Sequence, residues 1–247
     1  MLKRLSLYTF LLCLVPFFVW ISGWYWQGDG SLTAFDHFLY WLTETGSIPY
    51  AIITCGLFAL LLAPIFPKRY QWVIGVIIMA LSVVVTQGIK NGLKAVFAEP
   101  RPYVVELTEN SRISTEYFYA QSKADRAMMV ANYYARHGKV PSWLVQHRED
   151  EVSYSFPSGH SIFAAGWLLL AVGFSQLFGS NSLKTKAIIA VLTVWAVLML
   201  VSRLRLGMHN PIDLFVSTLI AWLIYCPLFV FLQKKTIFFK EFHPRCR

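Results

Sequence analysis

The chain has 247 residues, of which 56% are hydrophobic, 16% aromatic and 14% charged, and its mean hydropathy is +0.51. Soluble domains carry roughly 25% charged residues, so this composition excludes a soluble globular domain and indicates a polytopic membrane protein. The net charge of +9 does not indicate nucleic-acid binding, because Lys and Arg gather near the ends of apolar runs instead of forming one stripe. The cysteines show no metal-ligand spacing and predict no disulfide framework: Cys13, Cys55, Cys226 and Cys246.

Six apolar runs are predicted to cross a membrane, since about 20 apolar residues span the hydrocarbon core. In chain order they cover roughly residues 5–24, 48–66, 70–86, 160–178, 187–206 and 211–232. The first run follows Lys3 and Arg4 and ends in aromatic residues suited to a membrane interface. We interpret it as an uncleaved span, because no small-residue cleavage site follows it. The helical pattern of the third run continues through Lys90 and Lys94 to Phe97.

The basic residues of the short loops predict the orientation. With six spans, these residues and the cations of the C-terminal tail all fall on one side of the membrane: Lys3, Arg4, Lys68, Arg69, Lys184 and Lys186. The opposite short loops, 25–47 and 207–210, contain no Lys or Arg. By the positive-inside rule, both termini are then cytoplasmic and the other face is the outer one.

The one long hydrophilic region, residues 98–156, falls on that outer face. We expect it to form a cap inserted between spans three and four, with a helix over Gln121–His137 and a new start at Pro141. The sequence therefore predicts an all-α fold. Residues 1–247 form a single membrane domain, a polytopic helix bundle with six transmembrane helices and an outer cap.

The segment Pro157-Ser158-Gly159-His160 opens the fourth apolar run. Pro157 and Gly159 permit a tight turn, and Ser158 is a favourable N-cap. The turn presents the N-terminus of a helix at the membrane surface, where free N–H groups and the helix dipole favour an anion, above all phosphate. His160 lies beside this site and can carry a proton near neutral pH.

Two further clusters lie where spans meet the outer face. Lys94 and Arg101 follow the third span, and Arg203 and His209 flank the link between spans five and six. Cations in apolar surroundings are costly and tend to mark function, and the three cations can together clamp a dianionic phosphate. Asp213, the only one of 13 acids inside a predicted span, follows His209 by four residues. Its carboxylate can accept the imidazole N–H and leave the other nitrogen free to attack.

Each cluster also has a structural interpretation. Lys90 and Arg205 can reach lipid headgroups, which is the interpretation we favour for both. Arg203 and Asp213 can form a structural ion pair, and His209 can be an ordinary loop histidine. The other candidates are interpreted as solvated surface residues: His37, His137, His147, His243 and Glu99.

Taken together, the motifs carry a specific resemblance. Lys-x6-Arg-Pro, Pro-Ser-Gly-His and Ser-Arg-x5-His-x3-Asp occur in order and without a gap. They resemble the three-part signature of the type 2 phosphatidic acid phosphatase superfamily, which includes vanadium haloperoxidases, and the resemblance covers essentially the whole chain. It implies that His209 is a nucleophile forming a phosphohistidine, that Asp213 orients it, and that His160 protonates the leaving oxygen. It also implies a phosphate clamp made of Lys94, Arg101, Ser158, Gly159 and Arg203.

The resemblance further implies a lipid phosphatase of the bacterial inner membrane, whose cap and site face the periplasm and which uses no metal and no cofactor. Zinc ligation by His160, His209 and Asp213 is possible on ligand type, but the neighbouring cations oppose it. The expected substrates lie within the bilayer: phosphatidylglycerol phosphate, phosphatidate and undecaprenyl pyrophosphate. We expect contacts with membrane lipids, no nucleic acid and no obligate protein partner.

Two alternative functions stay open. A lipid-to-lipid phosphotransferase would use the same phosphohistidine, and added acceptor lipid would capture the phosphate. A non-catalytic carrier or flippase of anionic lipids would transport them without releasing phosphate, and it would tolerate His209→Ala.

Overall fold

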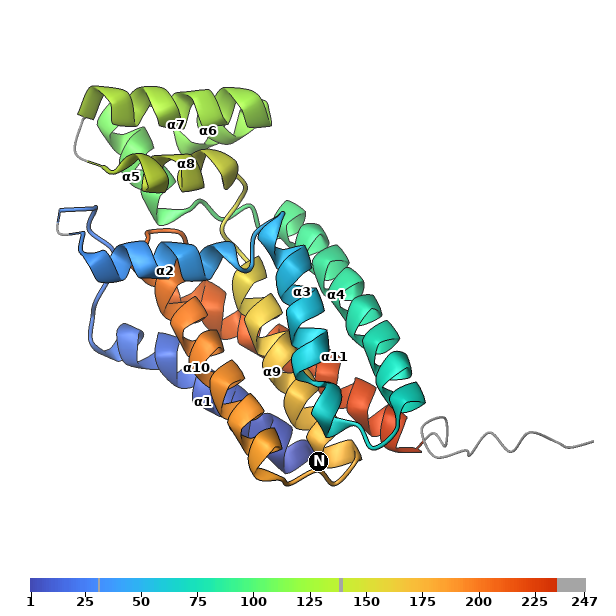
Figure 1. The fold of residues 1–247 in the computed structure, drawn as a ribbon. Helices are drawn as coiled ribbons and strands as arrows, with labels where there is room; N and C mark the ends of the chain where they lie inside the picture. Colours follow the sequence, from blue (N-terminus) through green and yellow to red (C-terminus); the bar gives the residue numbers. More distant parts are fainter. Residues whose placement is uncertain (31, 138–139, 235–247) are drawn as a thin grey trace, which may run out of the picture.

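The computed structural model describes residues 1–30, 32–137 and 140–234, and within these ranges all regular secondary structure is helical. Long helices form a bundle, and a group of shorter helices lies beyond one end of it (Figure 1). The bundle contains α1 (Leu2–Ile21), α3 (Tyr50–Leu61), α4 (Arg69–Phe97), α9 (Gly159–Leu177), α10 (Leu183–Arg205) and α11 (Pro211–Lys234). The outer group contains α5 (Pro102–Ser111), α6 (Thr115–Ala120), α7 (Lys123–His137) and α8 (Ser142–Asp150). Helix α2 (Ala34–Glu44) crosses the end of the bundle beneath the outer group (Figure 1).

The all-α prediction is confirmed for the described residues, and five helical stretches are long and apolar enough to cross a membrane. They are α1, the stretch that begins with α4, α9, α10 and α11. The predicted second span is shorter than expected, because α3 has 12 residues and then tightens into the 3₁₀ turn η1 (Ala63–Ile65). Pro64 explains this break, since proline cannot donate a helical hydrogen bond. Six spans and a periplasmic cap stay predictions.

Helix α9 is the centre of the bundle, and it packs against α1, α4, α10 and α11. Nearly all of its residues are buried. Two glycines allow α11 to approach closely: a Cβ at Gly166 would lie 2.8 Å from Tyr225 Oη, and one at Gly173 would overlap the Phe229 ring. This close packing fixes the starts of α9 and α11 relative to each other, and both starts carry site residues.

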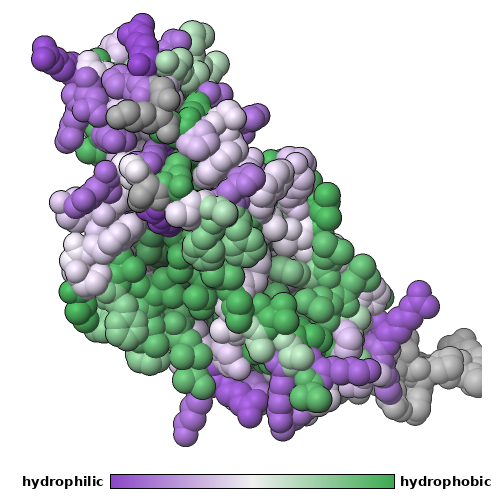
Figure 2. All heavy atoms as spheres, turned by 60° about the vertical axis from the view of Figure 1, so that its left-hand side comes forward, coloured by the Kyte–Doolittle hydropathy of each residue, from purple (hydrophilic) through white to green (hydrophobic). Residues whose placement is uncertain are grey.

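The sides of the bundle are largely apolar, and hydrophilic residues concentrate at its two ends (Figure 2). Large apolar side chains such as Trp20, Leu57 and Val84 are exposed on these sides. Such a belt is what contact with lipid tails requires. The first turns of α1, α4 and α10 lie at the end opposite the outer helices (Figure 1), which groups the basic residues of the short loops as predicted.

A second apolar core joins the outer helices to the link between α10 and α11. Its members are Tyr103, Val104, Leu107, Phe118, Val130, Tyr133, Tyr134, Leu144, Val152, Leu206 and Met208. Arg148 ties this core to the bundle, because its guanidinium donates to both carboxylate oxygens of Asp29, at 2.7 and 2.9 Å, and to Leu206 O at 3.0 Å. The predicted helix over Gln121–His137 is confirmed with its start at Lys123, but the described part of the region contains three further helices. Helices of six to ten residues are too short to show a clear period in the sequence.

Candidate active site

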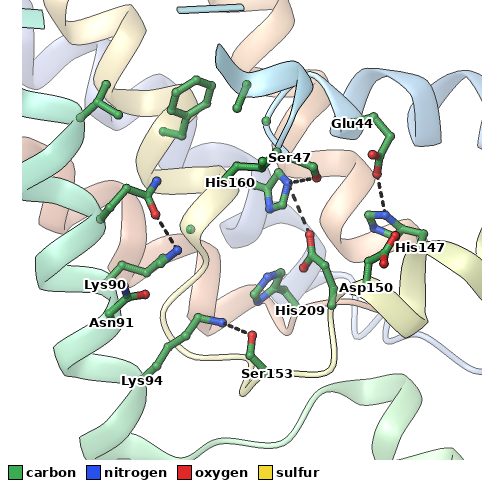
Figure 3. Close-up of a pocket in the computed structure, with 18 of the residues that line it drawn as sticks. Glu44, Ser47, Lys90, Asn91, Lys94, His147, Asp150, Ser153, His160 and His209 are labelled. Carbon is green, nitrogen blue, oxygen red and sulfur yellow. Dashed lines mark hydrogen bonds and ion pairs between the residues drawn. The ribbon is translucent and has the colours of Figure 1, made fainter. Parts of the chain in front are cut away.

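A cavity of about 770 Å³ lies where the outer helices meet the bundle. Figure 3 shows its labelled side chains converging from α2, α4, α8 and the starts or links of α9 and α11. All three predicted clusters reach this cavity, since its lining includes Lys94, Arg101, Gly159, His160 and His209. The other predicted site residues, Ser158, Arg203 and Asp213, lie fully buried just behind the lining.

The link between α10 and α11 positions His209. Gly207 has φ +71°, a left-handed conformation that favours glycine, and it reverses the chain directly after α10. The backbone N–H groups of Met208 and His209 then donate to Arg203 O at 3.0 and 3.1 Å. These bonds hold His209 against the last turn of α10, one helical turn from Asp213 in the first turn of α11.

His209 and Asp213 form the predicted dyad. His209 Nδ1 lies 3.2 Å from Asp213 Oδ2, which also accepts hydrogen bonds from the Ser155 hydroxyl and, at 3.0 Å, from Asn210 N–H. Because a carboxylate only accepts, the imidazole proton resides on Nδ1 and the lone pair on Nε2. Nε2 lies 3.4 Å from Arg101 Nη1, so the free nitrogen faces the predicted clamp.

The surroundings of His209 keep it neutral. Burial lowers its pKa well below the ordinary value, and the cations Arg101, Arg203 and Lys94 lower it further. A neutral imidazole with its proton directed to Asp213 has a lone pair available for attack on phosphorus.

The start of α9 places His160 opposite this dyad. Ser158 Oγ accepts from Ser161 N–H at 3.3 Å, which confirms Ser158 as the N-cap, and Ser158 N–H donates to Ser217 Oγ of α11 at 2.8 Å. His160 Nε2 lies 3.0 Å from Ser47 Oγ. A Cβ at Gly46 would lie 2.7 Å from the His160 ring, so this position of the imidazole requires glycine there.

Glu151, on which the cations converge, was not predicted from the sequence as a site residue. Its Oε2 lies 2.9 Å from Arg101 Nη2 and 2.8 Å from Arg203 Nη2, and its Oε1 lies 3.5 Å from His160 Nε2. Although burial opposes ionisation, Arg203, His160 and Arg101 hold the pKa of Glu151 well below its usual range. Glu151 is therefore a carboxylate at neutral pH, and it partly offsets the positive charge of Arg101 and Arg203.

The two lysines of α4 both point into the cavity (Figure 3). Lys94 donates to the Tyr154 carbonyl oxygen and to Ser153 Oγ at 3.3 Å. Lys90 donates to Gln87, and its stem crosses Gly159, where a Cβ would lie 2.7 Å from Lys90 Cδ. Lys90 therefore lines the cavity and Gly159 provides the space for its side chain, while contact of Lys90 with lipid headgroups stays a prediction.

Other structural interpretations also change. Arg203 pairs with Glu151 instead of Asp213, and Arg205 pairs with Asp36 at 2.7 Å instead of being purely interfacial. His147 is 3% exposed and contacts Arg203, so its interpretation as a surface residue is wrong. The surface assignment is confirmed for three residues and falls outside the described residues for a fourth: His37, His137 and Glu99 are exposed, and His243 is not described.

Comparison with known proteins places this site in a family. Residues 75–237 match the PAP2 superfamily. Phosphatidylglycerophosphatase B of Haemophilus influenzae is 56% identical over 238 residues, which cover 96% of this chain and 99% of that protein. Phosphatidylglycerophosphatase B of Escherichia coli K12 is 38% identical over 224 residues, covering 89% of this chain and 85% of that protein.

The chain therefore belongs to the PAP2 superfamily, and it is a phosphatase. The resemblance inferred from the three motifs is confirmed, and both relatives carry the name phosphatidylglycerophosphatase B, as the resemblance predicted.

Proposed function

We propose that the chain is a lipid phosphatase of the bacterial inner membrane that hydrolyses phosphatidylglycerol phosphate and related lipid phosphates or pyrophosphates. Phosphatidate and undecaprenyl pyrophosphate belong to the same substrate class. The observation that carries this proposal is the convergence of a histidine–aspartate dyad, a second histidine and cationic side chains on one cavity. We place six spans in the membrane, both termini in the cytoplasm and the site on the periplasmic face.

The cavity suits a lipid substrate with an anionic headgroup and apolar chains. One side is polar and cationic, and the other is lined by apolar residues of α9, α4, α3 and the turn before α3. These residues are Ile48, Ala51, Ile52, Cys55, Val83 and Phe163. A phosphate bound among the cations leaves its ester arm against this apolar wall, which leads into the bundle.

In the first step, His209 Nε2 attacks phosphorus and the ester P–O bond breaks. Asp213 stabilises the positive charge that develops on the imidazole, and the arginines and lysines stabilise the charge on the transferring phosphoryl group. Glu151, 3.5 Å from His160 Nε2, and the bound phosphate dianion stabilise a protonated His160. His160 donates this proton to the departing alkoxide, so the lipid alcohol leaves neutral. The product on the enzyme is a phosphohistidine.

In the second step, water attacks the phosphohistidine, the P–N bond breaks and inorganic phosphate leaves. His160, now neutral, accepts the proton of the water, which returns both histidines to their starting states. The clamp supplies the positive charge for both steps from Lys94, Arg101 and Arg203, with the N-terminus of α9 at Ser158 and Gly159 beside them.

The proposal is tested by phosphate release from the detergent-purified chain in EDTA, with phosphatidylglycerol phosphate, phosphatidate and undecaprenyl pyrophosphate offered separately. We expect release that survives EDTA and is lost in His209→Ala, while the exposed His137→Ala retains it. Adding an acceptor lipid separates hydrolysis from phosphotransfer, since a transferase would move the phosphate to that lipid. No release from any substrate by the folded protein would contradict the proposal.

A further inference from the structure

Arg203 has one edge that is fully occupied by the protein. Its Nη1 donates to Thr43 Oγ1 at 2.7 Å and to His147 Nε2 at 3.1 Å, so both Nη1 hydrogens have acceptors. On the other edge, Nη2 donates to Glu151 Oε2 at 2.8 Å, and Nε is buried without a hydrogen-bond partner among the described residues. The Nε–H and Nη2–H groups point the same way, as a fork that binds phosphate oxygens in pairs.

His147 receives its own support from α2. Its Nδ1 lies 2.8 Å from Glu44 Oε1 (Figure 3). A guanidinium cannot accept a hydrogen bond, so His147 Nε2 must be the acceptor from Arg203 and the proton must reside on Nδ1, where it is donated to Glu44. Glu44 therefore fixes the tautomer that His147 needs. The same carboxylate–histidine arrangement orients histidines that bind metal ions, and here the cation is a guanidinium.

The chain of contacts joins three elements that are distant in sequence. Glu44 ends α2, His147 lies on α8 of the outer group, and Arg203 lies in the last turn of α10. His147 and Arg203 are 3% and 0% exposed, so water does not compete for these hydrogen bonds. Without His147, Arg203 would keep only Thr43 and Glu151 as partners, so the orientation of its guanidinium would be held less firmly.

We propose that His147 and Glu44 are positioning residues, which hold Arg203 by Nη1 so that its Nε/Nη2 edge is presented to the phosphate. The role rests on the proposed function, because it gives Arg203 a phosphate to bind. Because His147 belongs to the outer group and Arg203 to the bundle, the contact between these two parts would then affect catalysis.

The test compares substitutions of His147 in the full, detergent-purified chain. His147→Leu removes both hydrogen bonds, whereas His147→Gln keeps a carbonyl oxygen near the position of Nε2 as an acceptor for Arg203. We expect His147→Leu to lower kcat/KM for phosphatidylglycerol phosphate by roughly tenfold to a hundredfold, the effect of removing a hydrogen bond to a charged group. His147→Gln should regain most of this loss, and the matched control His137→Leu on α7 should behave as wild type.

Inhibition by orthovanadate separates positioning from a structural role. Orthovanadate adopts the five-coordinate geometry of phosphoryl transfer, so its affinity reports how well the clamp fits the transition state. We expect its inhibition constant to rise in His147→Leu by about the factor that kcat/KM falls. A variant that only folded less well would lose kcat and keep the wild-type inhibition constant, and that result would overturn the proposal.

A double-mutant cycle tests whether His147 acts through Arg203. In an Arg203→Lys background the fork is already absent. Adding His147→Leu to that background should therefore lower kcat/KM by less than about threefold. Full additivity of the two losses would overturn the proposal. Glu44→Gln provides a second variant if His147→Leu does not fold. It keeps an acceptor for His147 Nδ1–H, so it should lower kcat/KM only a few-fold. An unchanged kcat/KM in Glu44→Gln, or a complete loss of activity, would refute the positioning role. Inactivity of the wild-type chain would instead refute the proposed function.

Discussion

Replacing Asp213 by asparagine separates two roles of this carboxylate. All three hydrogen bonds that reach it end on the single oxygen Oδ2, whereas Oδ1 is buried without a partner among the described residues. In Asp213→Asn, the amide oxygen can take the Oδ2 position and keep all three donors, including His209 Nδ1–H. The variant therefore retains the tautomer of His209 and loses the negative charge, while its amide NH2 group takes the buried Oδ1 position.

The expected loss follows from the geometry. Two unit charges 3.2 Å apart interact by about 5 kcal/mol at an effective dielectric constant of about 20. If about half a charge develops on His209 in the transition state, the loss is about 2.5 kcal/mol, or roughly 70-fold in kcat. Asp213→Ala also removes the hydrogen bond that fixes the tautomer, and it should lower kcat by about a further tenfold or more.

The assay is phosphate release from phosphatidylglycerol phosphate by wild type and both variants, with thermal denaturation as the control for folding. The comparison that matters is Asp213→Asn against Asp213→Ala. Equal activity of the two folded variants would refute the argument that the tautomer and the charge contribute separately, and wild-type activity of Asp213→Asn would refute the electrostatic role of Asp213.

Three other predictions concern the acid limb, the second lysine and the bundle core. Because the pKa of His209 lies below its ordinary value, the nucleophile stays neutral as pH falls past about 6.5. The decrease of kcat/KM toward low pH that we assign to His209 should therefore have its midpoint below pH 6.5. A midpoint at or above this pH would contradict the assignment. Lys90 lies one helical turn from Lys94 on the cavity face of α4, where it can contact a second anionic group of a substrate. Lys90→Met should therefore lower kcat/KM about tenfold more for undecaprenyl pyrophosphate, which has such a group, than for phosphatidate. An equal loss of kcat/KM for both substrates would exclude this selectivity. Gly173→Ala places a methyl group against the Phe229 ring and should lower the free energy of unfolding by about 1–3 kcal/mol. The folded fraction should keep the wild-type kcat, as measured by thermal denaturation and active-site titration. An unchanged melting temperature would show that α9 and α11 can separate at no cost in stability.

The parts of this protein that the sequence predicted are those with a local signal. The apolar runs mark α1, α4, α9, α10 and α11, because a helix in lipid must be apolar over its full length. The dyad was also predictable, since His209 and Asp213 are four residues apart at a helix start and must lie one turn from each other.

The supporting residues were not predictable, because they depend on contacts between distant segments. Glu151 and His147 lie in a hydrophilic stretch whose composition resembles a solvated surface. Only the packing of the outer helices onto the bundle buries His147 and leaves the Glu151 side chain 17% exposed. The same reason explains Lys90, whose place over Gly159 depends on how α4 packs beside α9. Folding gives these charged side chains partners that single-sequence patterns cannot show.

The central claim is that His209 carries the phosphoryl group, and a rapid-quench experiment with 32P-labelled phosphatidylglycerol phosphate tests it most directly. We expect a phosphoenzyme that is acid-labile and stable to base, and that is absent in His209→Ala. Label located on His209 would establish the two-step route. Phosphate release with no labelled protein at any time in an active, EDTA-treated enzyme, or equal labelling of His209→Ala, would contradict it.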